Sequence, residues 1–209
     1  MKLYSFPTSS AAYRARIALN LKGVAFETVT IRLRDGEQFG ERYRSVNPQQ
    51  RVPALELDDG TVLLQSLAIT EYLDRVRPEP PFLPDDPLER TRVLAVALMI
   101  ACDIHPLNNT SVLAYLRGDL ALDETQMSAW YAHWVRTGFA AIEQLIDAPA
   151  YCFGREPTVA DICLVPQVFN ARRYNVDIAD FPKILAVDAL ATAHPAFAKA
   201  HPSVQPGAA

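Results

Sequence analysis

The fold is decided by residues 2–31, KLYSFPTSSAAYRARIALNLKGVAFETVTI, in which the hydrophobic period changes twice. Lys2–Phe6 predicts a short strand, whereas Ala11–Lys22 repeats small and apolar side chains at helical spacing. Gly23 ends that helix as a C′ glycine, and Phe26–Ile31 is rich in β-branched residues. The stretch therefore predicts a strand, a helix and a second strand that is parallel to the first.

A hairpin and a further helix complete the first domain. The apolar runs Ala54–Leu57 and Val62–Leu64 are joined by an Asp-Asp-Gly turn that ends at Gly60, and Asp-Gly between apolar runs is typical of a β-hairpin. Ser66 follows as the expected N-cap of a helix. We therefore expect an α/β domain of order β-α-β, β-β-α over residues 1–78.

Proline divides this domain from the rest of the chain. Five of the 16 prolines fall within Arg77–Pro87, so residues 79–87 are the expected linker. Residues 88–209 show only helical periods and predict an all-helical domain, whereas the tail from His201 and the charged stretch Arg34–Arg44 predict no regular element. The expected helices are Leu88–Leu116, Glu124–Ile146, Val159–Ala171 and Ile184–Ala193.

Composition excludes several classes of function. The 209 residues are 50% hydrophobic, and 20 Lys and Arg stand against 24 Asp and Glu, so neither nucleic acid nor an acidic membrane is an expected partner. No apolar run is long enough to span a bilayer. Cys102, Cys152 and Cys163 form no CxxC pair, so we expect no metal, no disulfide framework and a reducing cytoplasm. Cys102 and Cys163 lie among apolar residues of predicted helices, so we expect both to be unreactive thiols in the core, whereas Cys152 lies in a loop-like stretch.

Five segments together resemble one protein family. Ser9–Leu19 resembles the signature SSCxWRVRIAL of the zeta-class glutathione transferases, and four further matches follow in order: Asn47-Pro48, Val52-Pro53, Gln65–Ile69 and Val165–Gln167. The resemblance runs from Lys2 to about Pro206. It implies a thioredoxin-like N-terminal domain and a helical C-terminal domain, the glutathione transferase fold.

The resemblance also implies glutathione as the cofactor and cis-trans isomerisation of maleylacetoacetate or maleylpyruvate, in the catabolism of aromatic amino acids. The implied route is addition of the glutathione thiolate, rotation about the former double bond, and elimination. Relatives of this class imply a cytoplasmic homodimer. Two other functions stay open at this point. One is a general glutathione transferase or dehalogenase that conjugates electrophiles, and the other is a non-catalytic protein of glutathione transferase fold.

The expected thiolate site lies at the start of the first long helix. A thiol with a pKa near 8.5 ionises more readily beside the positive end of a helix, where backbone N–H groups are unpaired. Ser9 and Ser10 are therefore the candidate catalytic residues, with the Ser9 hydroxyl donating to the thiolate. The alternative is that both serines only cap the helix. Thr8 takes the substrate-side position at which the class usually has arginine.

Four further residues of the first domain are candidates for holding glutathione. The resemblance implies a cis bond before Pro53, which would leave the backbone of Val52 open to an extended peptide. Gln65 and Ser66 stand at a helix start that can bind the γ-glutamyl carboxylate, although an ordinary N-cap would look the same. Arg51 can bind the glycyl carboxylate or be a solvated surface arginine.

The helical domain supplies the remaining candidates. Several polar residues follow closely on the apolar helical stretch that ends at Ile100, and Pro106 among them predicts a kink. We expect Asp103 and His105 to contribute to glutathione binding and Asn108, with Asn109 as the alternative, to lie near the substrate. The alternative for this group is a self-satisfied polar cluster that caps the kink. The resemblance assigns the substrate carboxylate to Arg173.

Overall fold

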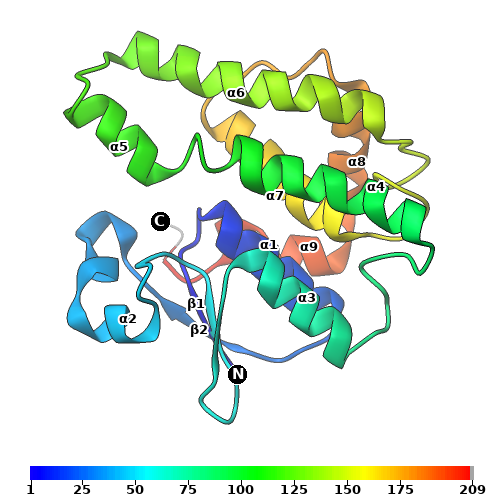
Figure 1. Ribbon diagram of the computed structural model, residues 1–209, viewed down its shortest axis with the longest axis horizontal. Coiled ribbons are helices and arrows are strands. Elements are labelled where there is room, and N and C mark those ends of the chain that lie inside the picture. The colour runs from blue at the N-terminus through cyan, green and yellow to red at the C-terminus, as the bar shows by residue number, and fades with distance from the viewer. Residues whose placement is uncertain (208–209) are drawn as a thin grey trace. The chain divides into compact units, whose positions relative to one another are not determined.

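The computed structural model describes residues 1–207, which form two compact units. The first unit comprises Met1–Pro81 together with the residues from Thr192 onward, and the second comprises Phe82–Ala191. Figure 1 shows the sheet and its helices in the first unit and helices only in the second. This is the predicted combination of an α/β domain and an all-helical domain.

The first unit contains a four-stranded mixed sheet of order β2-β1-β3-β4. The parallel pair β1 and β2 and the antiparallel hairpin β3 and β4 are both confirmed, with Gly60 at φ +85° in the hairpin turn. The strands are β1 (Lys2–Ser5), β2 (Glu27–Thr30), β3 (Ala54–Glu56) and β4 (Val62–Leu64), and the helices are α1 (Ser10–Leu21), α2 (Glu41–Val46), α3 (Ser66–Val76) and α9 (Pro195–Ala200).

Helix α1 is the centre of the first unit. It packs against α3 and α9, and its residues from Ala12 to Leu19 are buried (Figure 1). A cluster of Ala12, Ile31, Tyr43 and Val52 joins α1 to the segments that follow β2 and precede β3. The start of α1 is therefore held from several sides.

Two expectations for irregular segments were wrong. The charged stretch Arg34–Arg44 contains α2 and two 3-10 turns, which are too short to show a hydrophobic period. The tail from His201 is not loose as far as Gly207, because Pro202–Val204 forms a 3-10 turn in which Pro202 is buried. The residues from Thr192 also group with the first unit rather than with the helical domain to which the sequence assigned them. The last two residues of that tail, 208 and 209, lie outside the described residues.

The second unit is helical. Its core forms where α4 packs on α7 and where α6 packs on a π-helical segment, Met99–Ile104. Thr158 and Asp161 form the N-terminal capping box of α7, with the Thr158 hydroxyl donating to Asp161 Oδ2 at 2.9 Å. The helices are α4 (Pro87–Leu98), α5 (Thr110–Gly118), α6 (Glu124–Leu145), α7 (Val159–Arg173) and α8 (Pro182–Ala193).

The single helix expected over Leu88–Leu116 is broken in the structure. After α4 the chain forms the π-helical segment, in which the His105 N–H donates to the Ile100 carbonyl at 2.9 Å, and α5 begins only at Thr110. Pro106 has no N–H with which to continue a helix, and π-helical turns mark such irregularities. The kink predicted at Pro106 therefore separates α4 from α5.

Candidate functional site

Ser9 lies at the N-cap of α1. Its Oγ accepts a hydrogen bond from the Ala12 N–H at 3.3 Å, and its own N–H donates to the Phe6 carbonyl at 3.1 Å. The hydroxyl proton is not used in the cap, because Oγ is the acceptor there. The first turn of α1 contains no acidic residue, so its positive end is not neutralised by the helix itself. Ser9 therefore caps the helix and can also donate to an anion, whereas Ser10 is buried as the first helical residue.

The backbone around Val52 is fixed but not paired. The Val52–Pro53 bond is cis, as the resemblance implied. The preceding carbonyl, that of Arg51, accepts from the Tyr43 hydroxyl at 2.7 Å and from Asn47 Nδ2 at 2.6 Å. Within residues 1–207, neither the N–H nor the carbonyl of Val52 has a hydrogen-bond partner. These two groups can accept an extended peptide, while the Arg51 side chain is exposed beside them.

The start of α3 differs from the prediction. Gln65, not Ser66, is the N-cap, because the Gln65 carbonyl already accepts from the Ile69 N–H at 2.9 Å. Ser66 is buried as the first helical residue. Gln65 has φ 67° and ψ 121°, a conformation that is uncommon outside glycine, and its side chain makes no cap and donates instead to Gln49 at 2.7 Å. The first N–H groups of α3 are thus left without a side-chain cap, which suits a carboxylate.

Two of the candidates in the helical unit contact one aromatic pair. Asn108 Nδ2 donates to the Tyr131 carbonyl at 3.3 Å, and the Tyr131 ring stacks on Tyr174 at a centroid distance of 4.0 Å. The Arg173 guanidinium lies 5.4 Å from the Tyr174 ring centroid. Burial raises the pKa of the Tyr131 hydroxyl well above its ordinary value, so Tyr131 stays neutral. The structure therefore brings Asn108 and Arg173 to the same aromatic pair.

The other polar residues of this segment divide into different roles. Asp103 is exposed and His105 is half-buried, and no hydrogen bond or ion pair links the two. Asn109 is the N-cap of α5, where its Oδ1 accepts from the Ser111 N–H at 3.1 Å. In contrast, the Oδ1 atom of Asn108 is buried and has no partner within residues 1–207.

Of the two cysteines expected in the core, Cys163 is buried and Cys102 is not. Cys102 is exposed, although its apolar surroundings in the sequence predicted a core thiol. Cys152 and Cys163 are both fully buried, and burial raises the pKa of the Cys152 thiol well above its ordinary value. The Cys152 N–H donates to Asp161 Oδ1 at 2.7 Å, which ties this loop to the start of α7.

Sequence reasoning missed a hollow beside Thr8. It has a volume of about 150 Å³, and three charged residues line it with Thr8: Arg32, Arg34 and Asp35. Arg32 already pairs with Glu37 at 3.2 Å, whereas the Arg34 guanidinium has no partner within residues 1–207. The only sequence signal for Arg34 was the density of arginines after β2, in a stretch without a period.

A second residue without partners is Gln167 in α7. It is 0% exposed, and both polar atoms of its amide are without a hydrogen bond within residues 1–207.

In that same range no group of three His, Cys, Asp or Glu side chains is arranged to hold a metal ion. None of the helices described there has the length and hydropathy needed to cross a bilayer.

Comparisons with known proteins agree with this geometry. Residues 1–75 match the model of the glutathione S-transferase N-terminal domain, and residues 124–199 match the model of the C-terminal domain. The chain is 49% identical to the maleylacetoacetate isomerase of Pseudomonas aeruginosa over 208 residues, which cover 99% of this chain and 98% of that protein.

Two solved structures are similar over the full length of both chains. The holo structure of a maleylpyruvate isomerase, described as a bacterial glutathione S-transferase of the zeta class, has a TM-score of 0.97 and 45% identity, with 100% of each chain covered. The maleylacetoacetate isomerase of Methylobacterium extorquens AM1, solved with bound malonate and glutathione, has a TM-score of 0.96 and 36% identity, again with 100% of each chain covered.

Proposed function

Because this chain belongs to the zeta class of the glutathione S-transferase family, we propose that it is a glutathione-dependent cis-trans isomerase of maleylacetoacetate or maleylpyruvate. The observation that carries the proposal is the Ser9 hydroxyl, which caps α1 through its oxygen and keeps its proton for an anion. Its position at a helix start without acidic residues favours a thiolate over a thiol.

Three features of the first unit fit the three parts of glutathione. Ser9 suits the ionised thiol, and the unpaired N–H and carbonyl of Val52 suit the cysteinyl peptide. The uncapped start of α3, at Gln65 and Ser66, suits the γ-glutamyl carboxylate. Arg51 is exposed beside Val52 and is proposed to bind the glycyl carboxylate.

The chemistry follows from these positions. Glutathione, when bound, supplies a nucleophilic thiolate whose reversible addition to the cis double bond permits rotation. Ser9 stabilises the ionised sulfur by donating a hydrogen bond from its hydroxyl, and Ser10 holds the first turn of α1 in place as a buried helical residue. Each turnover leaves the cofactor unchanged, because the same sulfur that adds is also the leaving group.

The substrate is an acid, so carboxylate-binding groups are required. A relative of this chain was solved with malonate and glutathione together, which supports binding of a dicarboxylate. In the first unit Arg34, in the hollow beside Thr8, is a cation without a partner within residues 1–207. In the helical unit Arg173 and Asn108 are proposed to bind substrate, and Asp103 and His105 are proposed to contribute to glutathione binding. We assign the substrate role mainly to residues 88–191 and the glutathione role to residues 1–78.

The test is turnover of maleylacetoacetate and of maleylpyruvate by the purified protein, with and without glutathione. We expect isomerisation that depends on glutathione without consuming it, and Ser9→Ala to lower kcat by about 100-fold. Ser45→Ala is the matched control, because Ser45 is exposed and its hydroxyl donates only to the Arg42 carbonyl. Stoichiometric loss of glutathione would instead identify a conjugating transferase, and equal turnover by Ser9→Ala would remove the proposed thiolate site.

We also propose a cytoplasmic homodimer. The three cysteines are all unpaired, which supports a reducing compartment. The dimer rests on likeness to the family, in which two-fold symmetry is usual. Size-exclusion chromatography with light scattering tests it: a mass of twice 23.2 kDa is expected, and an active monomer would contradict the proposal.

A further inference from the structure

Arg16 is a buried cation in the middle of α1. Arg16 is 0% exposed, and its guanidinium donates four hydrogen bonds. Nε donates to the Ala200 carbonyl at 2.9 Å, and Nη2 donates to the Pro7 carbonyl at 2.9 Å. Nη1 donates to Ser5 Oγ at 2.9 Å and to the Phe6 carbonyl at 3.4 Å. All four acceptors are neutral.

The charge of Arg16 is not neutralised by a nearby carboxylate. Within residues 1–207, Arg16 takes part in no ion pair. Burial lowers the pKa of its guanidinium to about 10, so the group remains protonated at neutral pH. A buried charge without a counter-ion is costly, and such a charge persists where it has a function or is held by hydrogen bonds.

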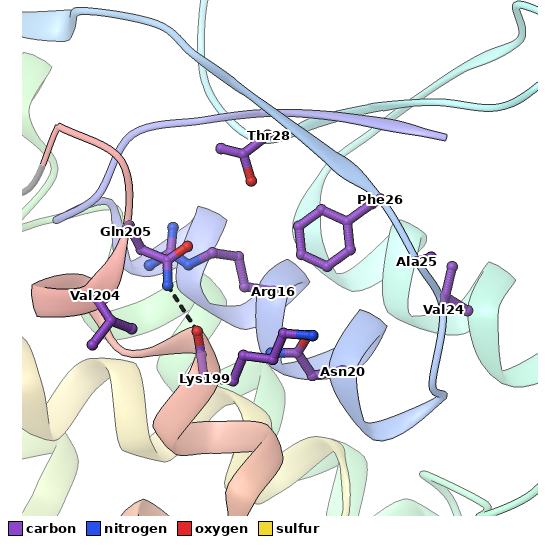
Figure 2. Close-up of a pocket in the computed structure, with 9 residues that line it drawn as sticks. All are labelled: Arg16, Asn20, Val24, Ala25, Phe26, Thr28, Lys199, Val204 and Gln205. Atoms are coloured by element: carbon purple, nitrogen blue, oxygen red, sulfur yellow. Dashed lines mark hydrogen bonds between the residues drawn. The ribbon is translucent and has the colours of Figure 1, made fainter.

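Among the residues that the structure describes, no acidic side chain lines the pocket beside Arg16. Arg16 lines a pocket of about 470 Å³. Figure 2 shows Gln205 toward the guanidinium end of Arg16, where the Gln205 amide donates to the Lys199 carbonyl at 2.8 Å. None of the residues that line this pocket is acidic: Arg16, Asn20, Val24, Ala25, Phe26, Thr28, Lys199, Val204 and Gln205. The ring of Tyr13 lies 5.3 Å from the guanidinium carbon, and the His201 ring packs edge-on against Tyr13. Within residues 1–207, neither the groups that accept hydrogen bonds from Arg16 nor the side chains that line this pocket include a carboxylate.

Two of the four hydrogen bonds hold the turn that leads to Ser9, and a third holds the Ser5 hydroxyl at the end of β1, just before that turn. The Phe6 carbonyl connects the two residues directly, because it accepts from Arg16 Nη1 at 3.4 Å and from the Ser9 N–H at 3.1 Å. The Pro7 carbonyl, two residues before Ser9, is held by Nη2. One guanidinium thus fixes the backbone on both sides of Pro7, at a place where proline cannot donate a hydrogen bond of its own.

We propose that Arg16 is a positioning residue for the glutathione thiolate: it fixes the Phe6–Ser9 turn and supplies an uncompensated positive charge behind the Ser9 hydroxyl. The inference rests on the proposed function of Ser9. Because the Phe6 carbonyl joins the Arg16 guanidinium to the Ser9 N–H, a thiolate held at Ser9 lies on the order of 10 Å from the guanidinium charge. At that separation, an effective dielectric constant of about 20 gives a pKa shift of about one unit. Arg16 is therefore expected to lower the thiol pKa of bound glutathione by about one unit.

The experiment titrates the ultraviolet absorbance of the thiolate in the complex of glutathione with the full-length protein. Arg16→Met is expected to raise the thiol pKa by about one unit and to move the pH–rate profile by the same amount to higher pH. Arg16→Lys keeps the charge but cannot hold both carbonyls, so it is expected to weaken glutathione binding with a smaller change in thiol pKa. Arg44→Met, which removes an exposed arginine of the same unit, is the control and is expected to change neither quantity.

The two layers of inference fail in different ways. A wild-type complex without a thiolate signal would refute the proposed function itself. A wild-type signal together with an unchanged thiol pKa and pH profile in folded Arg16→Met would overturn the role of Arg16 alone. If Arg16→Met does not fold, the role of Arg16 is tested with Arg16→Lys. Wild-type affinity for glutathione in Arg16→Lys would contradict the positioning role, whereas weaker affinity at a nearly unchanged thiol pKa would support it.

Discussion

Gly138 in α6 lies against the π-helical segment that carries the polar residues of the helical unit. A Cβ built on Gly138 would lie 2.3 Å from Ile104 Cδ1 and 2.5 Å from Ile104 Cγ1. Ordinary carbon contacts are about 3.5–4.0 Å, so one side chain must move. Ile104 is only 1% exposed and has little space into which to move. Glycine at position 138 therefore permits α6 to approach this segment closely.

Two opposing effects set the size of the change for Gly138→Ala. Alanine gains about 1 kcal/mol over glycine in a helix interior. Overpacking a buried site costs about 1–3 kcal/mol, so the net effect is a loss of up to about 2 kcal/mol. Gly118→Ala in α5 is the matched control, because nothing lies within 4 Å of its Cβ, and it is expected to be neutral or stabilising.

Ile104→Ala supplies the second arm of a double-mutant cycle. Alone it creates a cavity and costs about 2–5 kcal/mol. It also removes both clashing atoms and leaves Ile104 Cβ at 3.9 Å, an ordinary contact. In that background Gly138→Ala keeps its helix gain of about 1 kcal/mol, so the two changes couple favourably by about 1–3 kcal/mol.

Urea denaturation followed by tryptophan fluorescence measures the cycle. Both tryptophans of the chain, Trp130 and Trp134, lie in α6 with Gly138, so the signal reports on the helix that is changed. With a slope of about 2 kcal/mol per M of urea, a coupling of about 1 kcal/mol moves the midpoint by about 0.5 M. Equal destabilisation by Gly138→Ala in the wild-type and Ile104→Ala backgrounds would refute the proposed clash.

Three further predictions test charged groups. Asp74→Asn is expected to lower the free energy of unfolding by about 3 kcal/mol in urea denaturation, because Asp74 pairs at 2.7 Å with a Lys22 side chain that is 0% exposed. Glu71→Gln, which removes the exposed ion pair between Glu71 and Arg75, should cost less than about 1 kcal/mol, and equal losses from the two variants would contradict this. Arg34→Ala is expected to raise KM for the acidic substrate about 10-fold or more and to leave the affinity for glutathione unchanged. Arg32→Ala should raise KM less, because Arg32 already pairs with Glu37. An unchanged KM in Arg34→Ala would exclude Arg34 from substrate binding. Hydrogen bonds from Lys2 and Tyr4 lower the pKa of Glu56 below its usual 4.5. The contribution of the Glu56 carboxylate to stability is therefore present above pH 4.5 and is lost as the pH falls through the lowered pKa. If Glu56→Gln and the wild-type protein still differ in stability at the lowest pH, this is contradicted.

Much of the fold follows from local patterns. The order of strands and helices around α1, the hairpin at Gly60 and the capping box at Thr158 each depend on a few neighbouring residues. Turn, cap and period rules act over such short ranges, so they predicted these elements. The same rules located Ser9 at a helix start, where backbone N–H groups are unpaired whatever the rest of the chain does.

The errors lie where burial depends on distant segments. Cys102 is exposed, although its apolar neighbours in the sequence predicted a core thiol, because it lies in the π-helical segment. Cys152 lies in a loop, as the sequence indicated, and its burial was not predicted, because its N–H bonds to Asp161 nine residues away. The N-cap of α3 was placed one residue late, since Gln65 adopts a positive φ that no propensity favours.

What the sequence alone determined is therefore the β-α-β, β-β-α order of the first domain, the helical character of the second and the serine at the start of α1. What only the tertiary structure decided is how the site is supported: Arg16 donates to the carbonyl of Ala200, 184 residues away, and to the turn before Ser9. Arg34 reaches the hollow beside Thr8 in the same way, through folding rather than spacing. Local rules cannot find such pairs, because the free energy of a buried charge depends on which distant groups surround it.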